Sequence, residues 1–216
     1  LDARGLHYYF QYTLNDYERE GFEPNVPALE KRIETFRRLS ERIGPDRVVW
    51  RFDPIILSPG TGPRDILMRI WTIGKALRGL TKKLVVSFVD VGAYRKVQAN
   101  LVRDTDLYTR ETVLSAEPDE AQRREICEGL AKIRERWHSE GWDIEISSCA
   151  EEADLAAWGI THNRCIDGEL MERVFGEDKA LVHFLHSGKL PEAPAAGADS
   201  LFGDPVIPVV PVSKRR

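Results

Sequence analysis

The chain has 216 residues, a length that fits one globular domain or a domain with a tail. Hydrophobic residues make up 42% of it and charged residues 31%, and 31 Lys and Arg against 35 Asp and Glu leave a net charge of -4. The sequence has no run of about 18 uncharged apolar residues, so we expect no membrane-spanning segment and no membrane partner, and the acidic balance disfavours a general nucleic-acid binder.

Four segments rich in β-branched and aromatic residues predict buried strands, at residues 6–14, 47–55, 83–89 and 142–148. Between them, apolar residues recur at helical spacing over residues 29–43, 66–77 and 126–137, which predicts three helices with one apolar stripe each. Thr61 is the expected N-cap of the second helix. A fainter fifth unit follows, with a short helix at 151–158, a strand at 159–163 and a helix at 169–175.

Strands that alternate with helices are typical of parallel β/α units with right-handed crossovers. Residues 91–115 interrupt this pattern after the third strand, and insertions at the carboxyl end of a parallel strand commonly cover a ligand. Four or five units are too few to close an eight-stranded barrel. We therefore predict an α/β fold in which residues 1–186 form a partial (β/α) barrel of parallel strands with helices outside.

The composition changes after this expected barrel. Residues 187–216 hold five of the twelve prolines, with much Ala and Gly, which predicts a linker or an extended arm. The chain starts with Leu1 and shows no signal-peptide pattern, so we expect an interior segment of a longer protein.

Polar side chains follow the predicted strands at the ends where parallel strands present their ligands. They are Gln11, Thr13 and Asn15 at the end of the first strand, Arg51 and Asp53 at the end of the second, Ser87 and Asp90 at the end of the third, and Cys149 at the end of the fourth. Because residues two apart in a strand share a face, we expect these side chains to meet at one rim.

Arg51 is the most informative of these residues, because a guanidinium in a buried strand is costly unless it is paired with Asp53 or Asp90. Two interpretations stay open: a bidentate clamp for a carboxylate or phosphate of a ligand, and an internal Arg–Asp brace. Asp90 either binds a ligand hydroxyl or amine or caps the following loop. Asn15 either contacts the ligand or forms a turn.

Basic doublets occur along the chain, and most fall on helix exteriors, where solvated charge is the ordinary interpretation. Arg95 and Lys96 differ, because they follow Asp90 in the insertion beside the expected rim. These two side chains are candidates for contact with a phosphate.

The three cysteines are too few and too odd in number for a disulfide framework, so we expect a cytoplasmic protein. Cys149 and Cys165 are separated by fifteen residues, whereas metal sites usually show close Cys-x-x-Cys pairs. The histidines lack zinc-site spacing, and Cys127 lies beside the apolar stripe of a helix. We therefore expect no metal ligands in this segment.

Several phrases carry a family resemblance: YFQYTLN at 9–15, VWRFDPI at 49–55, SFVD at 87–90 followed by YRK at 94–96, CAE at 149–151 and CID at 165–167. From about Leu6 to Phe175 they resemble, in order, the bacterial family called domain of unknown function 1848. The resemblance implies the central segment of a partial barrel akin to radical S-adenosylmethionine enzymes and spore photoproduct lyase-like proteins. It also implies an iron-sulfur centre, with the cysteine cluster expected after Arg216 and the opening strands before Leu1.

The first hypothesis is therefore the barrel portion of an iron-sulfur, radical S-adenosylmethionine-type enzyme with a [4Fe–4S] cluster held from outside this segment and an unidentified substrate. The rim residues would line its site, with Arg51 on a carboxylate or phosphate and Asp90 on hydroxyls or the amino group. The alternative is a metal-free module that binds a nucleotide or a nucleic-acid end through Arg51, Arg95 and Lys96, with steep salt dependence. A metal-dependent hydrolase is disfavoured, because the strand ends lack a ligand set.

Overall fold

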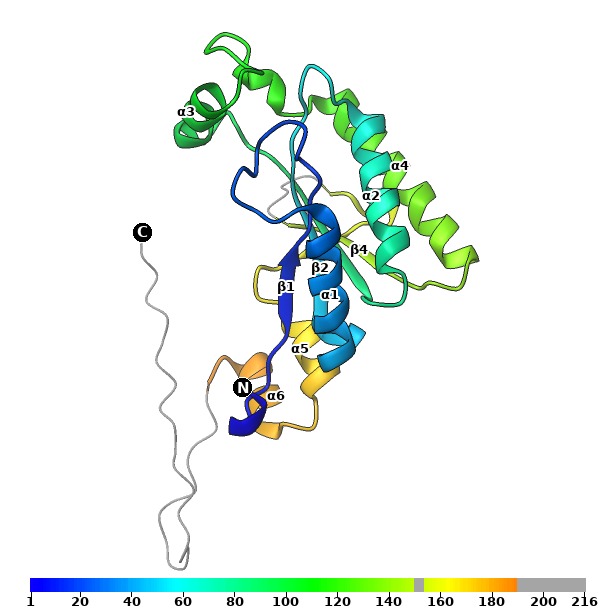
Figure 1. Cartoon of the computed structure of the whole chain (residues 1–216). Helices are drawn as coiled ribbons and strands as arrows, with labels where there is room; N and C mark the ends of the chain where they lie inside the picture. The colour runs from blue at the N-terminus through cyan, green and yellow to red at the C-terminus, as the bar shows by residue number, and fades with distance from the viewer. Residues whose placement is uncertain (150–153, 190–216) are drawn as a thin grey trace, which may run out of the picture. The chain divides into compact units, whose positions relative to one another are not determined.

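The computed structural model describes residues 1–149 and 154–189, and the chain divides into two units, residues 1–176 and 177–216. The first unit holds a sheet and its helices (Figure 1). In the second, α6 (Lys179–Ser187) is capped by the Asp178 carboxylate, which accepts from the backbone N–H of Ala180 and Leu181 at 3.0 Å. No helix of the described residues is long and apolar enough to cross a bilayer.

The predicted arm at 187–216 falls outside the described residues from residue 190 onward. The arm and its boundary at residue 186 therefore stay predictions.

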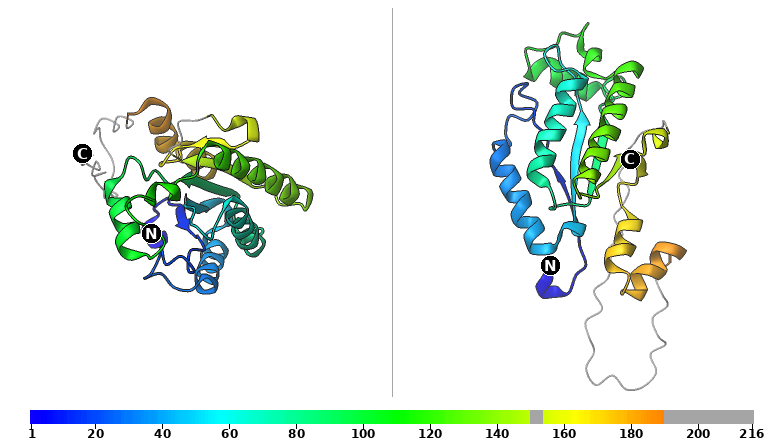
Figure 2. Two further views of the ribbon diagram at one scale, coloured as in Figure 1. Left: turned by 90° about the horizontal axis from the view of Figure 1, so that it is seen from above. Right: turned by 90° about the vertical axis from the view of Figure 1, so that its right-hand side faces the viewer.

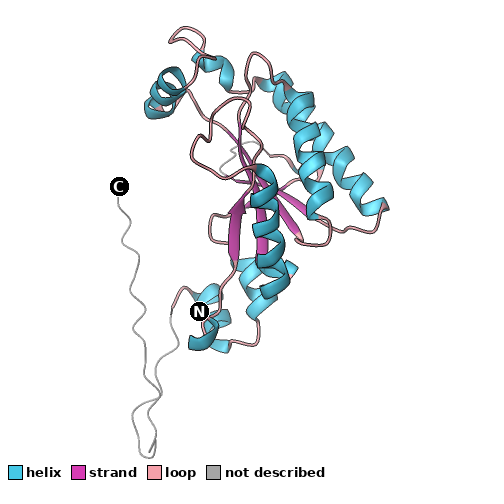
Figure 3. Cartoon of the chain, in the orientation of Figure 1, coloured by secondary structure: helices cyan, strands magenta, loops and turns pink. Residues whose placement is uncertain are grey.

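Five parallel strands form one sheet in the described part of the chain, in the order β1-β2-β3-β4-β5 (Figure 3). They are β1 (Phe10–Thr13), β2 (Val48–Ile55), β3 (Lys83–Phe88), β4 (Glu145–Cys149) and β5 (Thr161–Asn163). Each strand neighbours the next one along the chain, as repeated β/α units require. β1 begins at Phe10 rather than at residue 6, because its partner in β2 is Val48, the first residue of that strand.

Three helices lie side by side along one face of the sheet: α1 (Leu29–Ile43), α2 (Pro63–Leu77) and α4 (Glu120–Ser139) (Figure 2). Their apolar stripes are buried in one core with Trp50 and Phe52 of β2. Burying one such large side chain contributes about 1.5–3 kcal/mol, so this layer supplies most of the drive to fold. The predicted helices and their inward stripes are confirmed.

The residues of β2 that alternate with Trp50 and Phe52 are Val49, Arg51 and Asp53, and they lie on the opposite face of the sheet, which we name the inner face. α5 (Gly168–Phe175) covers part of it, since Leu170 and Val174 pack with Val49 and Val85. The fold is thus a parallel α/β sheet with helices around it. Its curvature into a partial barrel stays a prediction.

The insertion after β3 contains α3 (Arg95–Asp104) and a 3₁₀ turn, η3 (Val113–Ala116). Figure 1 places α3 beyond the carboxyl ends of the strands. The hydroxyl of Tyr108 donates to the carbonyl of Leu57, and the N–H of Leu57 donates to the carbonyl of Ala116 at 3.0 Å. These bonds attach the insertion to the segment that follows β2.

Two local predictions need correction. The N-cap of α2 is Gly62, whose N–H donates to Asp65 at 2.9 Å, because the hydroxyl of Thr61 is engaged by Glu20 at 2.6 Å instead. Of the helix predicted over 151–158, residues 151–153 lie outside the described residues. The described part is a single 3₁₀ turn, η4 (Ala156–Trp158), which ends at Gly159 with a left-handed φ of 66°.

Gly74→Ala is expected to lower the free energy of unfolding by about 1–3 kcal/mol, in spite of the helix propensity that alanine adds. A Cβ at Gly74 of α2 would lie 2.1 Å from Cζ2 of Trp137, a rigid ring held between the rings of Trp71 and Trp142. Chemical denaturation of the purified variant measures the loss.

The matched control is Gly129→Ala, on α4 of the same helix pair. Its added Cβ would meet Cδ1 of Leu67 at 2.2 Å, the far end of a flexible side chain that can rotate away. We expect this variant to stay within about 1 kcal/mol of wild type, and equal losses at the two glycines would contradict the argument.

Candidate functional site

Polar and thiol side chains meet on the inner face, at the carboxyl ends of the strands. We name this set the Arg51 cluster, and its members are Gln11, Arg51, Asp53, Ser87, Cys149 and Cys165. Each of the five strands, or the segment directly after it, contributes to the cluster. The structure thus brings together five residues that the strand-end pattern predicted, and adds Cys165.

Arg51 lies at the centre of the cluster, with its side chain 16% exposed. Its Nε donates to Oδ2 of Asp53 at 2.8 Å, its Nη2 donates to the same oxygen, and its Nη1 donates to Oε1 of Gln11. Burial by itself would lower the pKa of Arg51, but the hydrogen bonds and charge of Asp53, with a smaller contribution from Cys149, raise it above its ordinary value. Arg51 is therefore a fixed cation, and its brace partner is Asp53 rather than Asp90.

Asp53 is itself held from two sides. The hydroxyl of Ser87 donates to its other carboxylate oxygen, Oδ1. The backbone N–H of Asp53 donates to Oδ1 of Asn15 at 2.9 Å, and Nδ2 of Asn15 donates to the carbonyl of Asp53 at 3.1 Å. Asn15 is buried, and these two hydrogen bonds fix the position of the Asp53 backbone. Neither a ligand contact nor a simple turn describes that role.

The two thiols of the cluster differ in exposure. Cys149 is buried at the end of β4, whereas Cys165 is exposed two residues after β5, and their Sγ atoms lie 3.7 Å apart. Fifteen residues separate the two cysteines in the sequence. They lie close together because β5 pairs with β4, which places Cys149 opposite Asn163, two residues before Cys165. Nε2 of Gln11 donates to the carbonyl of Cys165 at 2.8 Å. The neighbouring Cys149 sulfur raises the pKa of the Cys165 thiol.

Four other predicted rim residues lie outside the Arg51 cluster. Thr13 is exposed at the end of β1, opposite Arg51 in the sheet register. Asp90 is exposed, and its Oδ1 accepts from the N–H of Ala93 at 2.8 Å, as the loop-cap interpretation requires. Arg95 and Lys96 are exposed on the first turn of α3.

A second buried network, which sequence reasoning missed, occupies the amino ends of β3 and β4. Nζ of Lys83 lies 2.7 Å from Oδ2 of Asp167 and 3.0 Å from Oε1 of Glu145. The same oxygen of Glu145 accepts from the hydroxyls of Ser147 at 2.7 Å and Thr161 at 3.0 Å. Asp167 also caps α5 by accepting from the N–H of Leu170 at 2.9 Å. This Lys83 network ties α5 to the sheet.

A family model described as a domain of unknown function (DUF1848) matches residues 1–192 of the chain. The chain belongs to this family. No curated protein and no solved structure matches it. The description of the DUF1848 family names no reaction, so the site has to be interpreted from its own chemistry.

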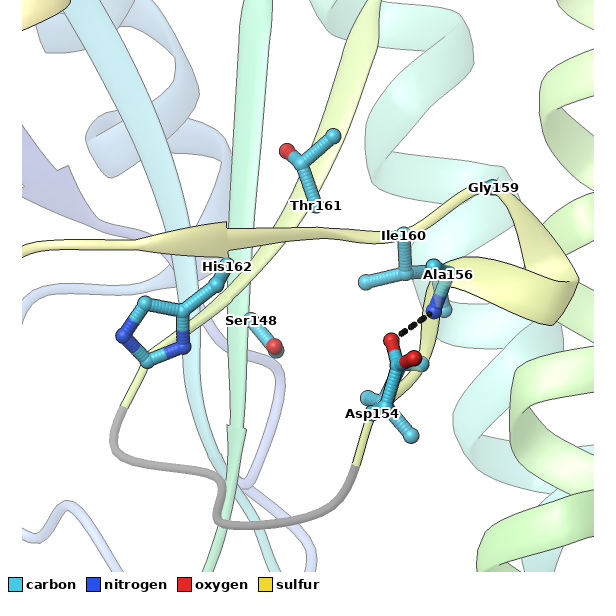
Figure 4. A pocket seen from close by; sticks show the side chains of 8 residues that line it. Ser148, Asp154, Ala156, Gly159, Ile160, Thr161 and His162 are labelled. Atoms are coloured by element: carbon cyan, nitrogen blue, oxygen red, sulfur yellow. Dashed lines mark hydrogen bonds between the residues drawn. The ribbon is translucent and has the colours of Figure 1, made fainter.

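This DUF1848 chain also has a hollow of about 340 Å³ beside Ser148 of β4, whose side chain points away from the inner face (Figure 4). Ser148, Ile160 and His162 line it together with Asp154, whose Oδ1 accepts from the N–H of Ala156 at 2.9 Å. The carboxylate of Asp154 is thus engaged in the turn before η4. The Arg51 cluster, with its paired charges and thiols, is the stronger candidate site.

The iron-sulfur centre that the family resemblance implies does not fit the described residues. A [4Fe–4S] cluster usually takes four thiolates. Residues 1–149 and 154–189 contain no group of three or more Cys, His, Asp or Glu that could hold a metal. Cys127 is buried in the core between sheet and helices, away from the inner face. Of the three cysteines of this DUF1848 chain, all of which the structure describes, Cys149 and Cys165 are the two whose sulfurs lie close together.

Proposed function

We propose that the inner face, at the carboxyl ends of the strands, binds a small ligand that carries a carboxylate or a phosphate, within an enzyme built on a partial β/α barrel. The observation that carries the proposal is the Arg51 cluster itself. A partly buried charged network costs desolvation energy, and an apolar core would make the sheet equally stable. Its position also supports the proposal, because open parallel α/β sheets bind ligands beyond the carboxyl ends of their strands.

The cluster would act by orienting Arg51 before the ligand arrives. A guanidinium has five N–H groups. In Arg51, two of them donate to Asp53 and one donates to Gln11, and these bonds fix the orientation of the guanidinium plane. A cation held in this way binds an anionic group without first losing side-chain entropy. The hydroxyl of Thr13 would contribute a polar contact to that anionic group, and the exposed carboxylate of Asp90 would bind hydroxyls or an amino group of the ligand.

The class of enzyme follows from the family resemblance. We expect an iron-sulfur, radical S-adenosylmethionine-type reaction, with the cluster ligands outside the described residues and the residues of this chain positioning the ligand. Anaerobic purification of the whole gene product, with iron analysis and a visible spectrum, tests this class. Iron with a broad band near roughly 400 nm is expected, and a colourless, iron-free protein would contradict it.

The second candidate is a metal-free nucleotide or nucleic-acid-end binding module. It is favoured by the exposed Arg95 and Lys96 on the first turn of α3, beyond the carboxyl ends of the strands. Phosphate contacts of this kind weaken steeply with added salt. Binding of ATP that falls with salt and that is lost in Arg95→Ala with Lys96→Ala would support this candidate over the first.

Arg51→Met is expected to weaken binding of the ligand about tenfold or more, because a hydrogen bond to a charged group contributes about 1.5–3 kcal/mol. Isothermal titration calorimetry with S-adenosylmethionine and with ATP measures it. Arg51→Lys keeps the charge without the fork, so an intermediate affinity is expected.

The control for this titration is Arg64→Met, which removes an arginine that is 92% exposed on α2. It should bind as wild type does, and circular dichroism checks that each variant is folded. The proposal is wrong if Arg51→Met binds like wild type, or if neither probe binds to the folded wild-type protein.

A further inference from the structure

The Cys149 and Cys165 sulfurs are close enough to react with each other. Their Sγ atoms lie 3.7 Å apart, and a disulfide needs about 2.05 Å, so an approach of about 1.7 Å closes the bond. Small rotations of the two side chains supply movement of this size. The pairing of β4 with β5 already fixes the two backbones side by side, with Cys149 opposite Asn163.

The two thiols are also arranged asymmetrically, as a pair with an attacking and a resolving member requires. Cys165 is an exposed residue, as the attacking member has to be. Cys149 is 3% exposed, and its sulfur lies close to both Arg51 and Cys165. The burial of Cys149 shields it from a small disulfide in solution but leaves it within reach of Sγ of Cys165, as the second step requires.

We propose that Cys149 and Cys165 form a redox-active dithiol that exchanges with low-molecular-weight disulfides of the glutathione class. The Cys165 thiolate attacks one sulfur of the small disulfide, whose S–S bond breaks, and the departing thiolate takes the proton that Cys165 lost. The Cys149 thiolate then attacks Sγ of Cys165 in the mixed disulfide and expels the second small thiol, which takes the proton of Cys149. The protein loses two electrons and two protons, and the small disulfide becomes two thiols.

The exchange reaches the Arg51 cluster directly. Cys149 is close enough to Arg51 to help raise the pKa of that guanidinium, and the carbonyl of Cys165 accepts from Nε2 of Gln11 at 2.8 Å. A disulfide replaces the Cys149 thiol by a sulfur that carries neither a proton nor a charge, and closing the bond shifts both side chains. The redox state of the pair therefore alters the partners of the guanidinium that we assign to ligand binding, but the exchange itself does not depend on that assignment.

Metal binding is the competing use of two sulfurs at this separation. Two thiolates on a tetrahedral zinc ion, with Zn–S of about 2.3 Å, lie about 3.8 Å apart. Such a site needs further ligands, and the described residues group no third Cys, His, Asp or Glu with the pair. The geometry therefore favours the covalent reaction.

The test is to equilibrate the full chain with a glutathione redox buffer, quench with acid, alkylate the remaining thiols under denaturing conditions and map the peptides by mass spectrometry. Wild type should lose two of its three free thiols, with Cys149 joined to Cys165 and Cys127 alkylated. Retention of all three thiols in oxidising buffer, or a pairing that includes Cys127, would overturn the proposal.

Two variants separate the steps. Cys149→Ser should accumulate a glutathione mixed disulfide on Cys165, at least about tenfold above its level in wild type, because the resolving thiol is missing. Cys165→Ser should keep Cys149 reduced, since that sulfur is buried. Equal mixed-disulfide levels in wild type and Cys149→Ser would show that Cys149 does not resolve the bond.

A separate experiment with zinc tests whether the two thiols bind a metal ion instead. Zinc alone should not protect Cys149 and Cys165 of reduced wild type from alkylation. Stoichiometric zinc binding that blocks both thiols and prevents disulfide formation in glutathione buffer would assign the pair to a metal site instead. The readouts are thiol counts and peptide masses, so failure here is distinguishable from failure of ligand binding.

Discussion

Lys83→Met is expected to lower the free energy of unfolding by about 3–5 kcal/mol near neutral pH, because it leaves two carboxylates of the Lys83 network without their cation. The side chains of Lys83 and Asp167 are only 9% and 11% exposed, so water replaces the lost partner of Asp167 poorly, whereas Glu145 is 35% exposed and is partly solvated. Methionine keeps the length and apolar stem of lysine, which limits the change to the charge. Urea denaturation followed by circular dichroism measures the loss.

The pH dependence of this loss has a definite sign. Burial by itself would raise the pKa of Asp167, but the hydrogen bonds from Lys83 and from the backbone N–H of Leu170, together with the charges of Lys83 and Arg173, outweigh burial and lower the pKa below its ordinary 3.8. A carboxyl with a lowered pKa contributes stability above its unfolded-state pKa and loses that contribution as pH falls through the lower folded-state value. The gap between wild type and Lys83→Met should therefore narrow as pH falls below about 4.

A second variant checks the cause. Lys83→Met combined with Asp167→Asn removes the uncompensated charge, and the asparagine side chain can still accept from Leu170 to cap α5. We expect the double variant to regain a substantial part of the lost stability at neutral pH. A single variant that loses less than about 1 kcal/mol, or a double variant less stable than the single one, would contradict the network's role.

Glu20→Gln is the second large effect, with an expected loss of about 3 kcal/mol near neutral pH. Glu20 lies between β1 and α1 and accepts from Nη1 and Nη2 of Arg69 at 2.9 and 2.7 Å, with Thr61 as a further donor. The side chains of Glu20 and Arg69 are 6% and 10% exposed. Glutamine removes the charge, turns an NH₂ group toward the donors of Arg69 and leaves that cation buried.

The stability contribution of Glu20 depends on pH in the same direction. Burial raises its pKa, but hydrogen bonds from Arg69 and Thr61 outweigh burial and lower it below its ordinary 4.5. Its stabilisation is therefore complete above that value and is lost as pH falls through the folded-state pKa, so wild type and Glu20→Gln should converge in acid. Denaturation curves across pH test this convergence.

The matched control for Glu20→Gln is Glu125→Gln, which breaks an exposed ion pair with Arg64 at 3.5 Å. An exposed pair contributes at most about 1 kcal/mol, so this variant should stay close to wild type at every pH. A similar loss in the two variants would mean that burial does not set the strength of the Glu20 pair.

Part of the candidate site was predictable from the sequence because strands have a period of two. Arg51 and Asp53 are two residues apart in a strand, so they share a face in any register, and they do form the pair. The ends of neighbouring parallel strands lie together, which placed Gln11, Ser87 and Cys149 beside them. The same reasoning left open whether Asn15 contacts a ligand or forms a turn, and it did not reveal the hydrogen bonds of this side chain with the backbone of Asp53.

Pairs of residues far apart in the sequence could not be predicted from strand periodicity and strand ends. Lys83 and Asp167 are 84 residues apart, and nothing in either local pattern marks them as partners. The spacing of Cys149 and Cys165 argued only against a metal site and did not reveal that the pairing of β4 with β5 places their sulfurs 3.7 Å apart. Such contacts depend on strand order and register, which short stretches of sequence do not specify.

The sequence by itself determined the α/β class, the order of the strands and helices, and the polar character of the strand ends. Periods of two and of about 3.6 residues are local properties, written in the spacing of apolar side chains. Only the tertiary structure decided which charges are neutralised and which thiols meet. Gln11 beside Arg51, Asp167 beside Lys83 and Cys165 beside Cys149 are all far away in the sequence, and burial decides how strongly each pair interacts.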